Sequence, residues 1–167
     1  LKYWVWLSEV KGLTNRSKLL LLDHFGSPEN IFYADEDEYR LVEGIEPRQI
    51  ALLAEKPMED VDRILGACSR LGLRLLTMQD ADYPVRLRNI FEPPCLLYVK
   101  GQLPVIDEEV AVAMVGTRKA SPYGVEAAEK IAYGLSRQGA VVISGAAAGV
   151  DSASHRGALR AGGKTIA

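Results

Sequence analysis

The stretch VAVAMVGTRKASPYGVEAAEKIAYGLSRQGAVVISGAAAGVD, from Val110 to Asp151, decides the fold. Two apolar runs, Val110–Val115 and Ala140–Ile143, are uninterrupted and rich in β-branched residues, as is typical of parallel strands buried on both faces. Each run leads into a loop of glycine, serine and threonine, and a helical pattern separates them. The order is therefore strand, loop, helix, strand, loop, helix. In an open α/β sheet such loops lie at the carboxyl ends of the strands, where ligands bind.

The first loop has the features of an anion site. Gly116 ends the strand, and Ser121-Pro122 predicts an N-cap followed by proline at the first helical position. The following helix has one apolar face, made of Val125, Ala128, Ile131, Ala132 and Leu135. Gly139 is placed to end it. The positive end of this helix would lie beside Thr117, Arg118 and Lys119, which favours binding of a phosphate.

The second loop repeats the arrangement. Gly145 and Gly149 would let the backbone approach a ligand, and we expect Asp151 to cap the helix that carries His155. Ser144 has no G-x-S-x-G surroundings, so it is interpreted as a loop hydroxyl for phosphate and not as a nucleophile. The candidate phosphate-binding residues are Gly116, Thr117, Arg118, Lys119, Ser121, Gly124, Ser144, Gly145, Gly149 and Asp151.

Two common nucleotide-binding motifs are excluded. A dinucleotide fingerprint needs G-x-G-x-x-G after the first strand and an acidic residue about 20 positions later, and neither is present. The run Gly162-Gly163-Lys164-Thr165 lacks the first glycine of a P-loop because position 158 is alanine. It also lies before a strand instead of after one.

Four segments together resemble the DNA-processing protein A (DprA, also called Smf) family. They are Val115-Gly-Thr-Arg118, Ser121-Pro-Tyr-Gly124, Ser144-Gly-Ala-Ala-Ala-Gly-Val-Asp151 and His155-Arg-Gly-Ala-Leu159, and the similarity extends to Tyr83-Pro84 and Pro93–Gly101. The resemblance implies a Rossmann-like, extended parallel sheet preceded by a small helical domain of the sterile-alpha-motif type. It also implies a non-catalytic, cytoplasmic homodimer that binds single-stranded DNA and loads the RecA recombinase during natural transformation, without a cofactor.

Composition sets wider bounds. The chain has 167 residues, 48% of them hydrophobic, and a net charge of −2, so any DNA site must be a local basic patch. Cys68 and Cys95 lack metal or redox spacing and are typical of unpaired thiols in a reducing cytosol. No apolar run reaches membrane length. A third strand begins near Gly163 and stops at Ala167, so we expect a parallel sheet truncated at its C-terminus.

The first part of the chain is predicted to be helical to about residue 70. We place a helical domain at 1–65 and a Rossmann-like DNA-binding domain at 66–167. Val10–Leu13 and Val42–Ile45 are similar to the turns of helix-hairpin-helix units, which present backbone N–H groups to phosphate. The alternative is that each glycine merely joins two helices, and the acidic character of this region favours that interpretation. Strands at Leu73–Thr77 and Cys95–Val99 are expected to extend the parallel sheet at one edge.

An enzyme is the second hypothesis. Asp151 and His155 are four residues apart on one helix and could form an acid/base pair, but no nucleophile or metal cluster accompanies them. The lysine-decarboxylase-like phosphoribohydrolases share a Gly-rich sheet architecture and carry a P-G-G-x-G-T loop. Here the matching loop, Ser144–Gly149, has no P-G-G and no acid. We therefore expect no catalytic residue, no metal and no cofactor.

Overall fold

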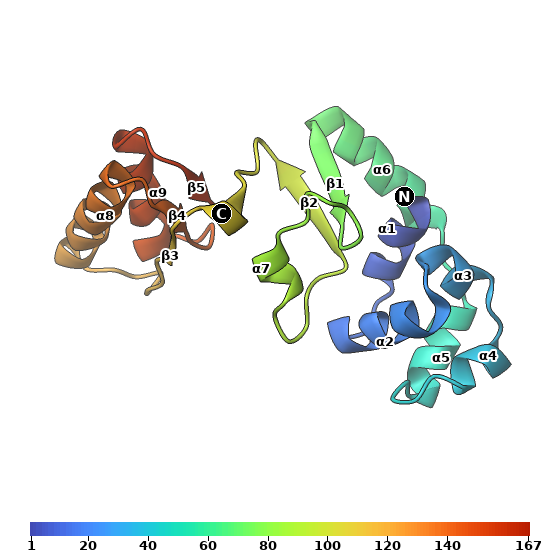
Figure 1. Cartoon of the computed structure of the whole chain (residues 1–167). Coiled ribbons are helices and arrows are strands. Elements are labelled where there is room, and N and C mark those ends of the chain that lie inside the picture. The colour runs from blue at the N-terminus through green and yellow to red at the C-terminus, as the bar shows by residue number, and fades with distance from the viewer. The chain divides into compact units, whose positions relative to one another are not determined.

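A computed structural model describes all residues, 1–167, as two compact units, Leu1–Gln102 and Leu103–Ala167. Figure 1 labels the elements along the chain. The first unit contains α1 (Lys2–Glu9), α2 (Asn15–Phe25), α3 (Pro28–Tyr33), α4 (Glu36–Arg40), α5 (Pro47–Ala54), α6 (Glu59–Leu71), β1 (Leu73–Thr77), α7 (Val85–Arg88) and β2 (Leu96–Lys100). The second contains the 3-10 turn η1 (Ile106–Glu108), β3 (Ala111–Ala113), α8 (Pro122–Arg137), β4 (Val141–Ile143), α9 (Val150–Arg160) and β5 (Thr165–Ile166).

Local signals set the helix boundaries in the first unit. The Thr14 side chain accepts a hydrogen bond from Ser17 N at the start of α2, and Ser27 does the same for Asn30 N at the start of α3. Gly26 ends α2 in the left-handed conformation. The helices enclose one apolar core around Trp6, which is 1% exposed. The amphipathic α6 carries the chain from these helices into β1.

Strands β1 and β2 pair with each other only, in an antiparallel two-stranded sheet with Leu75 opposite Tyr98. The prediction that they extend the parallel sheet is therefore wrong. Their inner residues pack on the helices instead, because Cys95 and Leu96 are buried in the same core as Trp6. The compact units divide after Gln102, whereas the sequence placed a domain boundary at 65/66.

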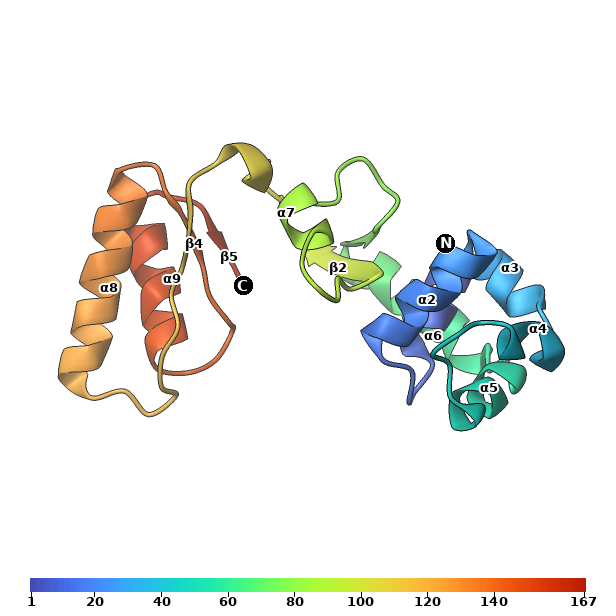
Figure 2. The same ribbon diagram turned by 60° about the horizontal axis from the view of Figure 1, so that its bottom comes forward.

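The second unit is a parallel sheet of order β3-β4-β5 with two helices on one face. Val112 lies opposite Val142 in the register, and Val142 opposite Thr165. Because strands that follow one another in the same direction use crossovers of the same hand, both connecting helices fall on the same side of the sheet. Figure 2 shows α8 and α9 side by side there. Val142 points into their core and is fully buried with Ala132 and Ala158.

The observed architecture confirms the predicted fold class. The second unit has the strand–loop–helix–strand–loop–helix order of a Rossmann-like α/β fold, and helices precede it. No helix in the chain combines the length and apolar character that crossing a membrane would require.

Candidate functional site

The two loops expected to form the site follow neighbouring strands and meet at the carboxyl edge of the sheet. Met114 N donates to Ile143 O at 2.8 Å, and Ser144 N donates to Ile166 O at 3.0 Å. The Ser144 hydroxyl donates to Met114 O at 2.7 Å, and the residue is 8% exposed. Ser144 therefore ties the ends of β3 and β4 together, and its single proton is already used.

Glycines allow the first loop to lie directly on the start of α9. Val150 N donates to Thr117 O at 3.2 Å. A Cβ on Gly149 would lie 2.3 Å from Thr117 O, and its φ of +83° is one that L side chains rarely adopt. A Cβ on Gly116 would lie 2.5 Å from a Val150 methyl group. These two glycines hold the loops in contact, so their role is packing as much as ligand approach.

The start of α8 is capped as predicted, which leaves little of it free for an anion. Ser121 Oγ accepts from Gly124 N at 3.1 Å, and Val125 N donates to Ser121 O at 2.9 Å. Pro122 has no N–H, so Tyr123 is the only first-turn residue whose amide keeps no acceptor. Ser121 and Gly124 thus shape the helix start, and side chains of the loop must supply most of the attraction for phosphate.

The expected cap of α9 is wrong. The N-cap residue is Gly149, and Asp151 lies inside the first turn. The Asp151 carboxylate faces the second loop, because a Cβ built on Gly145 would lie 2.7 Å from its Oδ2. Gly145 itself does not have a positive φ. A side chain at this position would meet the end of the Asp151 side chain but would not strain the backbone.

Arg118 and the second loop line a shallow pocket of about 520 Å³. Its lining residues are Arg118, Gly145, Ala146, Ala147, Ala148 and Asp151. The Arg118 side chain is exposed and takes part in no ion pair. The structure therefore brings one guanidinium and one carboxylate together over small residues. Lys119, whose backbone N donates to Thr117 Oγ1 at 3.1 Å, does not line this pocket.

His155 anchors the second loop to the sheet. Its Nε2 donates to Gly145 O at 3.0 Å, and its Nδ1 lies 2.7 Å from Thr165 Oγ1. The Thr165 hydroxyl also lies 2.8 Å from Val142 O, to which it can donate. Both ring nitrogens thus have partners within the protein, in agreement with the expected packing role. Sequence reasoning missed Thr165, since nothing in its neighbourhood indicates a contact with a helix ten residues earlier.

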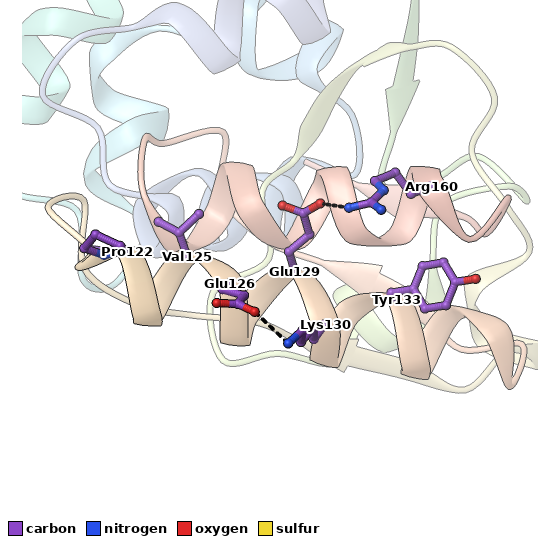
Figure 3. Close-up of a pocket in the computed structure, with 8 residues that line it drawn as sticks. Pro122, Val125, Glu126, Glu129, Lys130, Tyr133 and Arg160 are labelled. Carbon is purple, nitrogen blue, oxygen red and sulfur yellow. Dashed lines mark hydrogen bonds and ion pairs between the residues drawn. The ribbon is translucent and has the colours of Figure 1, made fainter.

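A larger pocket of about 740 Å³ lies on the outer side of α8, where it meets the end of α9 (Figure 3). Its charged residues pair with one another: Glu126 binds Lys130 at 2.6 Å, and Glu129 binds Arg160. The hydrogen bond from Arg160, helped by the charges of Arg160 and Arg156, lowers the pKa of Glu129. The charges on this surface are paired with one another, and none of the predicted site residues lines the pocket.

The arrangement of the two loops indicates the general class of protein to which the chain belongs. Two small-residue loops at the carboxyl edge of a parallel sheet, with an unpaired arginine beside them, are typical of α/β proteins that bind ligands at this edge. Residues 74–167 match the family model described as DNA recombination-mediator protein A. The chain belongs to this family, whose members act in DNA processing and recombination.

Named relatives agree with this assignment. The DNA processing protein DprA of Bacillus subtilis is 32% identical over 104 residues, which are 62% of this chain and 35% of that protein. The protein Smf of Synechocystis is 32% identical over 169 residues, which are 99% of this chain and 42% of that protein. The DprA of Streptococcus pneumoniae is 43% identical over 88 residues, which are 53% of this chain and 30% of that protein.

A solved structure is similar as well. The X-ray structure of DprA from Streptococcus pneumoniae matches with a TM-score of 0.72 and 29% identity, covering 100% of this chain and 56% of that one. The chain thus spans 30–42% of the length of the three relatives named above.

Proposed function

We propose that the two loops bind single-stranded DNA and that the chain, as part of a DNA recombination mediator, helps load the RecA recombinase. The observation that carries this proposal is the exposed, unpaired guanidinium of Arg118 beside the small residues Gly145–Ala148. A planar guanidinium suits a phosphate in two-point contact, and small side chains leave room for a sugar-phosphate backbone.

The other predicted residues would contribute to binding in different ways. Thr117 and Gly116 place Arg118, because they lie against Val150 and Gly149. Lys119 adds positive charge nearby. The Asp151 carboxylate is negatively charged and has no proton to donate to a phosphate oxygen. In this proposal it accepts a hydrogen bond from the amino group of a base instead. This arrangement favours a strand that runs past Arg118 with its bases toward the second loop.

The proposal of partners other than DNA is based on the family to which the chain belongs. The description of the matching family as a recombination mediator supports RecA as the protein partner. We also propose that the complete protein is a cytoplasmic homodimer.

The alternative is a nucleotide-processing enzyme of the phosphoribohydrolase type. Such chemistry needs an acid/base pair or metal ligands beside the anion site. His155 is engaged with Gly145 O and Thr165, and no group of three or more metal-ligating side chains exists in the chain. The non-catalytic proposal is therefore preferred.

A product assay separates the two hypotheses. The chain is incubated with AMP, ATP and oligo-dT, with and without Mg²⁺, and products are followed by chromatography. We expect no turnover, and we expect His155→Gln to keep its affinity for oligo-dT because glutamine can still donate to Gly145 O. Turnover that is lost in His155→Gln would favour the enzyme. Tighter binding of AMP than of oligo-dT would also contradict the single-strand proposal.

A further inference from the structure

The first unit contains an internal repeat with an offset of 32 residues. In the sequence, Val10-Lys-Gly12-Leu13 corresponds to Val42-Glu-Gly44-Ile45. Both glycines have positive φ, +88° and +91°, in the turns between α1 and α2 and between α4 and α5. Helices α2 and α5 begin 32 residues apart, at Asn15 and Pro47. The unit is thus two copies of a helix–turn–helix hairpin, joined by α3.

The two hairpins pack on each other reciprocally. A Cβ on Gly12 would lie 2.7 Å from a Leu52 methyl group, and one on Gly44 would lie 3.0 Å from a Leu20 methyl group. Leu20 and Leu52 are themselves equivalent in the repeat. When residue i of one copy meets residue j of the other and the converse also holds, the copies are related by a two-fold axis. The first unit therefore has approximate internal two-fold symmetry.

A buried polar contact joins the starts of α2 and α5. Gln49 Nε2 donates to Ser17 Oγ at 2.8 Å, and Gln49 is 4% exposed. Ser17 and Gln49 also differ by 32 in residue number, so this hydrogen bond links equivalent positions. It joins the N-terminal ends of the two helices.

Basic side chains flank this contact symmetrically. Arg16 precedes Ser17, and Arg48 precedes Gln49, so the arginines are equivalent in the repeat. Both are exposed, and neither forms an ion pair. Lys11 adds a third positive charge in the first turn. In the second turn, Glu43 and Glu46 offset part of the positive charge of these three side chains, so the local excess of positive charge is small.

Several other acidic residues of this unit lie outside the two turns. Glu36, Asp37 and Glu38 lie in the first turn of α4, and Asp23 lies near the end of α2. The hairpin turns adjoin the opposite ends of these two helices. Glu36 and Asp37 are also paired with Arg40. Acidic charge therefore opposes phosphate binding less at the turns than over the unit as a whole.

We propose that the hairpin surface, residues 11–16 and 43–48, binds the backbone of double-helical nucleic acid. The two strands of a duplex are antiparallel and are related by local two-fold axes, a symmetry that two-fold proteins match. Arg16 and Arg48, placed about the internal axis, fit one phosphate on each strand. A single strand has no such axis. Contacts of this kind position the protein without reading the sequence.

The proposal goes beyond single-strand binding and uses residues of the first unit only. The test is a fluorescence anisotropy titration of the whole chain with a 20-base-pair duplex and with oligo-dT at several salt concentrations. We expect Arg16→Ala/Arg48→Ala to weaken duplex binding and to lower its log–log salt slope by roughly 1.8, about 0.9 for each lost contact. We expect its affinity for oligo-dT to be unchanged.

Two controls keep the outcomes distinct. Arg70→Ala removes an exposed arginine from the end of α6, away from both turns, and should leave duplex binding unchanged. Arg118→Ala should weaken binding of oligo-dT and spare the duplex. Circular dichroism checks the folding of each variant. Duplex affinity and slope that are unchanged in the double variant, or no duplex binding by the wild-type chain at low salt, would overturn the proposal, whatever the result for oligo-dT.

Discussion

Gly149 is the residue on which the site geometry most depends. Its φ of +83° and ψ of −127° suit glycine alone, and a Cβ there would lie 2.3 Å from Thr117 O and 2.7 Å from Arg118 O. We expect Gly149→Ala to lower the free energy of unfolding by about 3 kcal/mol, from backbone strain and overpacking together. Urea denaturation followed by circular dichroism measures this.

Gly139 supplies the matched control. Its φ is +88°, but a Cβ there would meet no atom within 4 Å. Gly139→Ala should therefore cost only the strain, about 1–2 kcal/mol. Equal losses in the two variants would mean that the contact between the loops contributes nothing.

Tyr39 makes the stability of the first unit sensitive to alkaline pH. Its hydroxyl donates to Ile31 O at 2.6 Å, and the residue is fully buried. Burial, with smaller contributions from Glu38 and Asp35, raises the pKa of Tyr39 to about 12. A raised pKa stabilises the fold fully below the ordinary value near 10, and this contribution is lost as the pH rises through the folded value.

We expect Tyr39→Phe to lower the free energy of unfolding at pH 7 by about 1 kcal/mol, because Ile31 O loses its partner. The difference from wild type should shrink between pH 10 and 12, since phenylalanine does not ionise. Urea titrations at pH 7 and pH 11 test this. Tyr123→Phe is the control, because the Tyr123 side chain is 81% exposed. A difference that stays constant with pH would contradict the burial argument.

At the scale of elements, α8 and α9 pack closely because Gly157 has no side chain. A Cβ on Gly157 would lie 2.2 Å from Glu129 O and 3.0 Å from Ala132 Cβ. We expect Gly157→Ala to cost about 1–3 kcal/mol from overpacking. Gly134 lies in the last turn of α8, exposed and with no atom within 4 Å of its would-be Cβ. Gly134→Ala should stabilise the helix by about 0.5–1 kcal/mol.

Thermal unfolding of the two variants distinguishes packing from helix propensity, since the changes in stability should have opposite signs. Stabilisation by both substitutions would show that α8 and α9 can move apart without penalty.

Elements with local signals could be predicted from the sequence. The cap at Ser121-Pro122, the end of α8 near Gly139 and the order of strands and helices all follow from neighbouring residues. The partner of β1 could not be predicted, because an apolar strand pattern does not say which sheet it joins. The repeat was visible in the sequence as Val-x-Gly-Leu and Val-x-Gly-Ile, but its symmetry appears only in the packing of Gly12 and Gly44.

The positions of the two loops could be predicted from the sequence, whereas the contacts that their residues make could not. Both loops were located correctly at the carboxyl edge of the sheet. The cap by Gly149, the carboxylate of Asp151 facing Gly145 and the bond from His155 to Thr165 join residues from different elements. Periodicity and turn propensity describe neighbours along the chain, so contacts between elements lie beyond them.

At the scale of the whole molecule, a net charge of −2 over 167 residues gives no general attraction for DNA. Binding must therefore come from a few local contacts. Loss of any one of them should change the dependence of the binding affinity on salt concentration. We assign single-strand contacts to the second unit, at Arg118, and duplex contacts to the first. Loss of one side chain should accordingly affect one kind of nucleic acid.

The salt dependence of oligo-dT binding by Arg118→Ala shows whether the Arg118 guanidinium contacts a phosphate of single-stranded DNA. Affinity is measured by fluorescence anisotropy at several salt concentrations for wild type, Arg118→Ala and Arg137→Ala, an exposed arginine at the other end of α8. We predict weaker binding by Arg118→Ala and a log–log slope lower by roughly 0.7, the value for one phosphate contact on a single strand. Arg137→Ala should match wild type. Unchanged affinity and slope in Arg118→Ala would mean that Arg118 does not contact single-stranded DNA.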